Sequence, residues 1–253
     1  MKQINILWTG GLDSTYRVLE LSRTEVTIQP YYLAEVNPST QYEINAILQI
    51  TKKILKRPET KCVLLPLVVV QISQILPNSE ITAAWEKLHD LYRLGSQYDW
   101  IARFAKQYNL TLELGIEKDY SESTIIRCLL NTGGYSILDT EEAVVSENGT
   151  EDSRLVFKNM RFPLPLFNMT KEDEIHQYKK WGADNILNQT WFCYRPVNGK
   201  PCGLCDPCKT YIEVGLGNRI PKNRLKLYYF RKNNERLFNS IRNIKRKIKA
   251  LFR

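Results

Sequence analysis

The chain has 253 residues, of which 43% are hydrophobic. This is enough for one well-packed α/β core with one small appended module, and it argues against two large independent domains. The formal net charge is +9, but residues 222–253 hold twelve Lys or Arg against the single acid Glu235, a local balance of +11. Residues 1–221 therefore carry 9 − 11 = −2, so the basic character belongs to the C-terminal segment.

The N-terminal residues lead directly into an apolar segment, without the charged leader and cleavage site of a secretory signal. The most apolar stretch, residues 62–76, is interrupted by Pro66, Gln71, Ser73 and Gln74. It is also shorter than the roughly 18 residues that a membrane span needs. We therefore expect a cytoplasmic protein without a membrane span, in which residues 62–76 form a buried strand or helix.

Hydrophobic periodicity predicts strands that alternate with helices along the first half of the chain. The predicted strands cover residues 4–8, 27–33, 61–70 and 110–115. The predicted helices cover residues 15–21, 42–55, 79–94 and 98–108. Such alternation is typical of a Rossmann-like α/β fold, with a mainly parallel sheet covered by helices on both faces.

The second half of the chain is less regular. Glycines and a polar run at residues 146–152 interrupt any periodicity between residues 117 and 158, so we expect loops near a site there. A further helix is predicted from Thr170 to about residue 182, with Thr170 and either Asp173 or Glu174 as its capping residues. We expect three parts in all: a main α/β domain at residues 1–185, a small module at 186–221 and a basic helical tail at 222–253.

Residues 9–15 read Thr-Gly-Gly-Leu-Asp-Ser-Thr and join the first predicted strand to the first predicted helix. Glycines let the backbone approach an anion closely, and the free amides at the start of a helix bind phosphate. Hydroxyl groups add donors, and Asp13 is expected to cap the helix or to help hold Mg²⁺. The candidate ATP-binding residues are Trp8, Thr9, Gly10, Gly11, Leu12, Asp13, Ser14 and Thr15.

The spacing of this loop differs from the GxxxxGK[ST] and GxGxxG patterns. It resembles the pyrophosphate loop SGGxDS of the adenylating PP-loop ATPases, with Thr9 in place of the leading serine. That replacement keeps a hydroxyl group. The alternative interpretation is a tight strand-to-helix turn with a capped helix and no ligand.

Four of the six cysteines crowd into residues 193–208, whereas Cys62 and Cys128 lie alone in apolar surroundings. In a chain without a secretory signal, this crowding favours a metal site over disulfides. Zinc prefers four tetrahedral sulfur ligands, and a closed site of this kind is structural. The predicted ligands are Cys193, Cys202, Cys205 and Cys208. An iron–sulfur cluster and a redox-active CxxC pair are the alternatives.

The order of the two motifs resembles the 7-cyano-7-deazaguanine synthase (QueC) family. That family carries a pyrophosphate loop at the N-terminus and a T-x-x-C-Y…C-G-x-C-x-x-C signature, which here reads T-W-F-C-Y-x₇-C-G-L-C-D-P-C from Thr190. Residues 161–164 and 169–174 are similar to the family's P-L…T-K-x-E segment. The family's D-Y-G-Q-x-H and S-G-Y-P-D-C segments have no match between residues 31 and 160. ATP activation and zinc therefore carry over more directly than the acceptor.

The resemblance implies an ATP-dependent carbon–nitrogen ligase that uses ATP, Mg²⁺, ammonia and a structural zinc ion. Its implied substrate is 7-carboxy-7-deazaguanine, whose carboxylate would be adenylated and converted to an amide or nitrile. Lys171 is the candidate catalytic residue, because a cation there can neutralise phosphate or the substrate carboxylate. Otherwise Lys171 is a solvated lysine in the first turn of a helix.

Three other functions stay open at this point. A QueC-like paralogue could join the activated acyl group to a protein amine or a nucleic acid. A tRNA thiolase of the same ATPase superfamily would need a reactive cysteine, which the apolar settings of Cys62 and Cys128 disfavour. A zinc-ribbon protein that binds nucleic acid without catalysis would fit the cysteines and the basic tail, but not the loop at residues 9–15.

The tail contains an apolar stripe at helical spacing, bordered by Lys and Arg. Its members are Leu237, Ile241, Ile244, Ile248 and Leu251. This pattern favours a helix docked on its own domain or on a second subunit of a homodimer. A polyanion such as tRNA or DNA, or a membrane surface, is the alternative partner.

Overall fold

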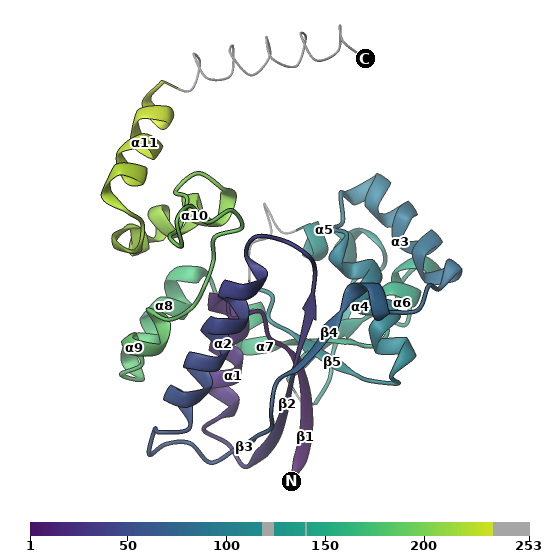
Figure 1. Ribbon diagram of the computed structural model, residues 1–253. Coiled ribbons are helices and arrows are strands. Elements are labelled where there is room, and N and C mark those ends of the chain that lie inside the picture. The colour runs from purple at the N-terminus through teal and green to yellow at the C-terminus, as the bar shows by residue number, and fades with distance from the viewer. Residues whose placement is uncertain (118–123, 140, 235–253) are drawn as a thin grey trace, which may run out of the picture. The chain divides into compact units, whose positions relative to one another are not determined.

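The computed structural model describes residues 1–117, 124–139 and 141–234 (Figure 1). The chain forms two compact units, Met1–Trp191 and Phe192–Arg253. The first unit carries the sheet and the candidate phosphate loop, and the second carries the four clustered cysteines.

The sheet of the first unit is mainly parallel, as the alternation of elements predicts. Its strands are β1 (Lys2–Leu7), β2 (Val26–Ala34), β3 (Val63–Leu64), β4 (Val68–Gln71), β5 (Leu112–Leu114), β6 (Tyr135–Ile137), β7 (Glu142–Val145) and β8 (Met160–Pro163). Their order is β3-β2-β1-β5-β8-β7-β6. Strand β4 pairs with the same side of β2 as β3 does, but nearer the C-terminal end of β2. All pairs from β3 to β8 are parallel, whereas β7 and β6 add an antiparallel edge.

Helices cover both faces of this sheet, with α1 and α2 on one face and α3, α4 and α6 on the other (Figure 1). The helices of the unit are α1 (Leu12–Leu21), α2 (Thr40–Ile54), α3 (Ser79–Tyr92), α4 (Gln97–Gln107), α5 (Thr124–Asn131), α6 (Glu151–Phe157), α7 (Leu164–Phe167), α8 (Lys171–Lys180) and α9 (Asp184–Leu187). Successive side chains of β5 point to opposite faces of the sheet. Leu112 and Leu114 enter the hydrophobic core formed with α3 to α6, while Glu113 binds Arg17 of α1.

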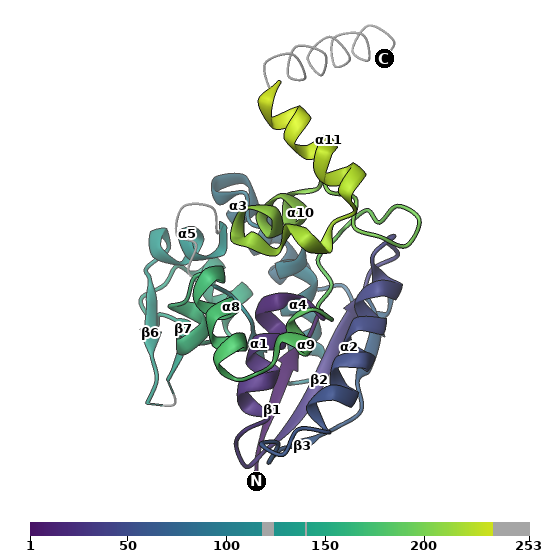
Figure 2. The ribbon, with the colours of Figure 1, turned by 90° about the vertical axis from the view of Figure 1, so that its left-hand side faces the viewer.

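Helix α8 packs beside α1, as Figure 2 shows. The Tyr178 hydroxyl donates a hydrogen bond to the Leu12 carbonyl at 3.0 Å, and the ring of Tyr16 stacks on Trp181 at 5.2 Å. Thr170 caps the helix in a capping box with Asp173, one of the two capping partners expected from the sequence. These contacts hold the start of α8 close to the loop that precedes α1.

The prediction that residues 62–76 form a buried strand or helix is wrong for most of the segment. The chain there makes two short strands, β3 and β4, which pair only with β2 at the edge of the sheet. Val63, Val68 and Val69 are exposed, and only Val70 and Ile75 are buried. The apolar composition of the segment did not show that it lies at the edge of the sheet, where most of its side chains stay exposed.

The prediction of loops between residues 117 and 158 is also wrong for the described part of that region. It contains α5, the hairpin of β6 and β7, and α6. Helix α5 buries Ile125, Ile126 and Leu129, and Thr150 caps α6 by accepting a hydrogen bond from the Ser153 amide. The glycines that suggested loops lie in the turns between these short elements, which are too brief to show a clear period.

The second unit is small and built around aromatic rings. It contains α10 (Asp206–Tyr211), the short turns Ile212–Leu216 and Gly217–Arg219, and α11 (Lys222–Asn233). Phe192 stacks on Tyr211 with ring centroids 3.8 Å apart, and the Arg219 guanidinium lies over both rings. Helix α11 buries Tyr228, whose hydroxyl donates to Glu213 at 2.9 Å.

The described part of the basic tail is thus a helix docked on its own unit. The predicted apolar stripe of Leu237, Ile241, Ile244, Ile248 and Leu251 lies outside the described residues. Among the helices that the structure describes, none is long and apolar enough to span a membrane.

The ion pair of Arg17 and Glu113 gives a first prediction. Its N–O distance is 2.7 Å, the Glu113 side chain is 4% exposed, and burial raises the pKa of that carboxyl despite the arginine. Arg17→Met would leave a buried carboxylate without its cation, so we expect a loss of about 3–5 kcal/mol in the free energy of unfolding at pH 7.

Chemical denaturation at several pH values measures this loss. It should shrink as the pH falls, because protonation of Glu113 removes the uncompensated charge. Glu20→Gln, which removes only the more exposed partner of Arg17, is the matched control and should cost about 1 kcal/mol or less. An Arg17→Met loss as small as that of the control would contradict the prediction.

Candidate functional site

The first unit has a topological switch point at the carboxyl ends of β1 and β5. Strand β1 lies between β2 and β5, and the chain builds β2, β3 and β4 on one side before it crosses to β5 on the other. Open parallel sheets bind ligands in the crevice at such a point. A cavity of about 170 Å³ lies there, lined by Leu7, Thr9, Gly11, Asp13, Ser14, Gln97, Tyr98, Ile101, Leu114, Gly115 and Ile116.

Two glycines allow the backbone segments to meet at this crevice. Gly10 has φ +71°, and a Cβ there would lie 2.9 Å from the Glu43 carbonyl oxygen. Gly115, directly after β5, lies so close to α1 that a Cβ would be 2.8 Å from the Ser14 amide nitrogen. Neither position has room for a side chain unless the backbone moves.

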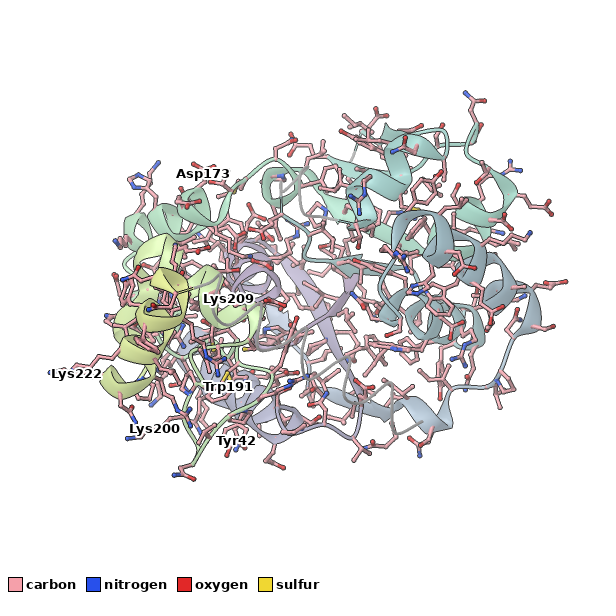
Figure 3. The ribbon with its side chains drawn as sticks, turned by 90° about the horizontal axis from the view of Figure 1, so that it is seen from above. Tyr42, Asp173, Trp191, Lys200, Lys209 and Lys222 are labelled. Carbon is pink, nitrogen blue, oxygen red and sulfur yellow. The ribbon has the colours of Figure 1, made fainter. Side chains whose placement is uncertain are left out.

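The Gly10 carbonyl also accepts a hydrogen bond from the Trp191 amide at 2.8 Å. The Trp191 ring stacks on Tyr42 of α2 with centroids 4.7 Å apart (Figure 3). The loop at residues 9–15 is thereby fixed to Trp191, the last residue of the first unit, which precedes the cysteine-containing segment in sequence.

The N-terminus of α1 has the properties of an anion site. Gly11 occupies the N-cap position and has no side chain that could accept a capping hydrogen bond from the first helical amides. The first helical amides therefore have no intrahelical acceptor, and the helix dipole adds partial positive charge at the same place. Asp13 does not cap the helix, which was one of the two roles expected for it.

The predicted loop residues divide into two groups. Thr9 and Ser14 face the cavity, and their hydroxyl oxygens are 3.1 Å apart. Trp8 and Thr15 are fully buried, and the Trp8 indole donates to the Thr15 hydroxyl at 2.9 Å. Their side chains therefore hold the loop in shape, together with buried Leu12, and the loop residues that line the cavity are Thr9, Gly11, Asp13 and Ser14.

Lys171 lies beside this loop although it is 158 positions away from Asp13 in sequence. Its Nζ is 2.8 Å from Oδ1 of Asp13 and 2.6 Å from Oε1 of Glu117. The lysine side chain is only 16% exposed, which excludes the interpretation as a solvated lysine. Burial by itself lowers the pKa of Lys171, but the nearby Asp13 and Glu117 carboxylates raise it above its ordinary value, so the side chain is a fixed cation.

Sequence reasoning missed two carboxylates of this cluster, Glu117 and Glu174. One carboxylate oxygen from each of Asp13, Glu117 and Glu174 lies within 4.8 Å of the other two. Both could have been found: Glu117 follows the second strand of the switch point, and Glu174 is one helical turn after Lys171.

The four predicted zinc ligands come together in the second unit. Their sulfur atoms all lie within 4.8 Å of one another, and the Cys193–Cys205 and Cys202–Cys208 distances are both 3.9 Å. Ligands at Zn–S distances of about 2.3 Å on a tetrahedron are about 3.8 Å apart. The four cysteines can therefore hold a zinc ion.

Local turns explain how this arrangement forms. A bridge between Val197 and Lys200, with positive φ at Asn198 and Gly199, reverses the chain between the first two ligands. The next two ligands follow from the start of α10, where Cys205 is the N-cap residue and Cys208 lies in the first turn.

The surroundings of the sulfurs favour negative charge. The Cys202 amide donates to the Cys193 sulfur, and the Leu204 and Cys205 amides donate to the Cys202 sulfur. Hydrogen bonds among the thiols lower the pKa of Cys205 and raise the pKa of Cys193 and of Cys208. Thiolates are the form that binds a metal.

Comparison with known proteins agrees with one part of this picture. Residues 138–213 match the family model of the queuosine biosynthesis protein QueC. A 7-cyano-7-deazaguanine synthase of Leptospira biflexa serovar Patoc (strain Patoc 1 / Ames) is 40% identical over 73 residues, 27% of this chain and 26% of that protein. A synthase of the same name from Rhizorhabdus wittichii is 39% identical over 59 residues, 21% of this chain and 25% of that protein.

The chain thus spans about a quarter of the length of the curated relatives it matches. The family match contains Lys171, Glu174 and all four clustered cysteines, but not the loop at residues 9–15. This chain is QueC-like in sequence over residues 138–213, and the comparisons do not cover the loop at residues 9–15.

The cysteine geometry predicts about one zinc ion per chain in the purified protein, by elemental analysis. Cys205→Ser removes one of four ligands, so we expect loss of the metal and of solubility, because folding of this unit would be coupled to the ion. Cys62→Ser, a lone half-buried thiol, is the control and should keep its zinc. A folded wild-type chain without metal would contradict the prediction, as would the visible absorbance of an iron–sulfur cluster.

Proposed function

We propose that the protein is an ATP-dependent carbon–nitrogen ligase that activates a carboxylate by adenylation. The observation that carries this proposal is the uncapped N-terminus of α1 at the switch point, bordered by the Thr9 and Ser14 hydroxyls and the fixed cation of Lys171. Free amides, hydroxyls and a lysine are the groups that bind the phosphates of ATP and stabilise the departing pyrophosphate.

The similarity over residues 138–213 supports 7-carboxy-7-deazaguanine as the substrate, since the relatives are called 7-cyano-7-deazaguanine synthases. In the proposed first stage, the substrate carboxylate oxygen attacks the α-phosphorus of ATP, which forms an acyl-adenylate and releases pyrophosphate. Ammonia then attacks the acyl carbon, and an amide, AMP and a proton result. Activation overcomes the poor electrophilicity of the carboxylate.

The nitrile needs a second round of the same chemistry. The amide oxygen would attack the α-phosphorus of a second ATP and again release pyrophosphate. Loss of AMP and of the protons on nitrogen would then leave the carbon–nitrogen triple bond. A QueC-like paralogue would use only the first stage, ending at the amide or passing the acyl group to a protein amine or nucleic acid.

In this proposal the loop backbone and Lys171 have different roles. The backbone after Gly10 and Gly11 would approach the β- and γ-phosphates, with ATP carried as its Mg²⁺ complex. Lys171 would act as a fixed charge and not as a proton donor, because Asp13 and Glu117 stabilise its protonated form.

The described cysteines do not favour a thiolase. Burial raises the pKa of Cys128 to about 12 and also raises the pKa of Cys62. Neither thiol would be a thiolate near neutral pH, and a sulfur carrier needs that form. The remaining four cysteines face one another in the cluster of the second unit.

The adenylation proposal predicts AMP and pyrophosphate, not ADP, when the protein is incubated with ATP, ammonia and 7-carboxy-7-deazaguanine. Gly11→Val should abolish turnover by keeping the phosphates away from the backbone. Gly11→Ala is the sharper variant, because its Cβ would meet nothing closer than 3.4 Å and the fold should persist.

We expect roughly 100-fold slower turnover in Gly11→Ala with an unchanged melting temperature. Mass spectrometry of the products identifies the amide or nitrile. Release of ADP would contradict adenylation, and full activity in both Gly11 variants would show that the loop does not bind the phosphates.

A polyanion is the proposed partner of the basic C-terminal segment. Helix α11 carries five Lys or Arg and no acid, and Tyr229 and Phe230 on it are exposed. Cationic side chains bind the phosphate backbone of single-stranded nucleic acid, and exposed aromatic rings stack on its bases. Docking of Tyr228 on Glu213 shows that this helix is part of the second unit, so a deletion that tests the segment should spare it.

Removal of residues 235–253, which hold seven of the twelve basic residues of the segment, should weaken binding of single-stranded RNA. With six to ten phosphate contacts, affinity of the full chain should fall by about 10³-fold or more between 50 and 200 mM salt. Fluorescence anisotropy measures both effects, and ATP turnover is the control that should survive. Aggregation of the truncated chain, with no salt-sensitive RNA binding by the full chain, would instead indicate a docked apolar helix.

A further inference from the structure

A second cavity of the first unit lies at the edge of the sheet opposite to the loop at residues 9–15. Its volume is about 540 Å³, against about 170 Å³ for the cavity beside that loop. Val144 and Val145 line it at the C-terminal end of β7. Because β7 runs antiparallel to β8, and β8 runs parallel to β5 and β1, this end of β7 lies at the amino ends of the parallel strands. The cavity is therefore separate from the switch point.

Three cationic side chains line this second cavity. Arg154 lies in the last turn of α6, Lys158 follows one turn later at the C-cap position, and Arg161 lies on β8. The acids that also line the cavity are Glu147 and Glu151, which leaves a formal charge of +1. Within the part of the chain that the structure describes, none of the three cations forms an ion pair with any acid. Their charges are thus available to a ligand.

Backbone carbonyls hold the two guanidinium groups in place. Nη1 of Arg154 donates a hydrogen bond to the Glu147 carbonyl at 3.1 Å. Nη1 of Arg161 donates to the Lys158 and Met160 carbonyls at 3.1 and 2.9 Å. The described residues accept no hydrogen bond from the other guanidinium nitrogens. A guanidinium that is held at one nitrogen presents its remaining N–H groups in a planar fork, which matches the oxygens of a phosphate or carboxylate.

The size and the apolar part of the lining indicate what else the ligand contains. Val144, Val145 and Leu155 line the cavity and are each half-buried. The volume of about 540 Å³ lies within the roughly 300–1,000 Å³ of pockets that bind small organic molecules. A phosphate monoester carries a charge of about −1.5 to −2 near pH 7, which suits three cations better than a single carboxylate does. The three cations also gather in one cavity, whereas a nucleic acid strand needs cations along its length.

We propose that this cavity binds a small phosphorylated molecule of nucleotide size, whose phosphate group contacts Arg154, Lys158 and Arg161. The apolar residues of the lining would contact the body of the same molecule. The inference does not rest on adenylation, because the cavity lies at the opposite edge of the sheet from the loop. The competing interpretation is a set of solvated cations, two of which interact only with the C-terminal dipole of α6.

Calorimetric titration of the full chain with uridine 5′-monophosphate (UMP) separates the two interpretations. We expect saturable binding by the wild type and at least tenfold weaker binding by Arg154→Gln/Lys158→Gln, since two of the three phosphate contacts are removed. Lys52→Gln/Lys56→Gln is the matched control, because these two cations at the end of α2 are also exposed and four positions apart. It should bind UMP like the wild type. Melting curves verify that both variants fold.

Two further titrations define the ligand and the place where it binds. Uridine, which lacks the phosphate, should not bind measurably, and inorganic phosphate should bind more weakly than UMP because it lacks a body for the apolar residues. Gly11→Val alters the loop at residues 9–15 and should leave the affinity for UMP unchanged. Should Arg154→Gln/Lys158→Gln fail to fold, Lys158→Gln alone takes its place, with an expected loss of at least threefold.

The site would be overturned by absent UMP binding in the wild type or by an equal loss in the control variant. Loss of binding in Gly11→Val with unchanged affinity in Arg154→Gln/Lys158→Gln would place UMP at the loop instead, with the same consequence. Binding of oligouridine that depends on Arg154 and Lys158 but that UMP does not displace would assign the cations to nucleic acid, against the proposal. UMP binding as expected, without AMP formation from ATP, would support this site and contradict adenylation alone.

Discussion

The site depends on the close approach of two backbone segments, the turn after β5 and the first turn of α1. Gly115 makes this approach possible, because a Cβ there would overlap the Ser14 amide. The same approach places Glu117, two residues further on, opposite Asp13 on α1. A larger residue at position 115 would separate the strand from the helix, and both the cavity and the charge cluster would lose their shape.

Helix α8 contributes the other half of the cluster, and it does so through its own docking. Tyr178 and Trp181 fix its C-terminal half on α1, so the first turn reaches the loop at residues 9–15. Lys171 and Glu174 then project from the same face at a spacing of one turn. The helix therefore brings both the cation that pairs with Asp13 and Glu117 and a further buried carboxylate, whose charge the same cation offsets in part.

The elements that sequence predicted well are those with a strong local signal. The strands and helices of residues 2–54 have clear periods, and the loop between β1 and α1 is defined by its glycines. The cysteine cluster followed from spacing alone, since CxxC steps place sulfurs around one point. Residues 124–158 failed because their elements are short, and the edge strands β3 and β4 failed because exposure depends on which neighbours a strand has.

The charge cluster could not be predicted as a whole, because its members meet only through the sheet order. Lys171 was found by its motif, but its motif could not show that Asp13 and Glu117 would surround it. The position of β5 beside β1, which no local pattern specifies, is what brings Glu117 to the loop. Glu174 follows once α8 is docked, since its backbone position leaves the carboxyl no route to solvent. The same docking places Glu174 beside Asp13, and burial together with the Asp13 charge raises the pKa of Glu174.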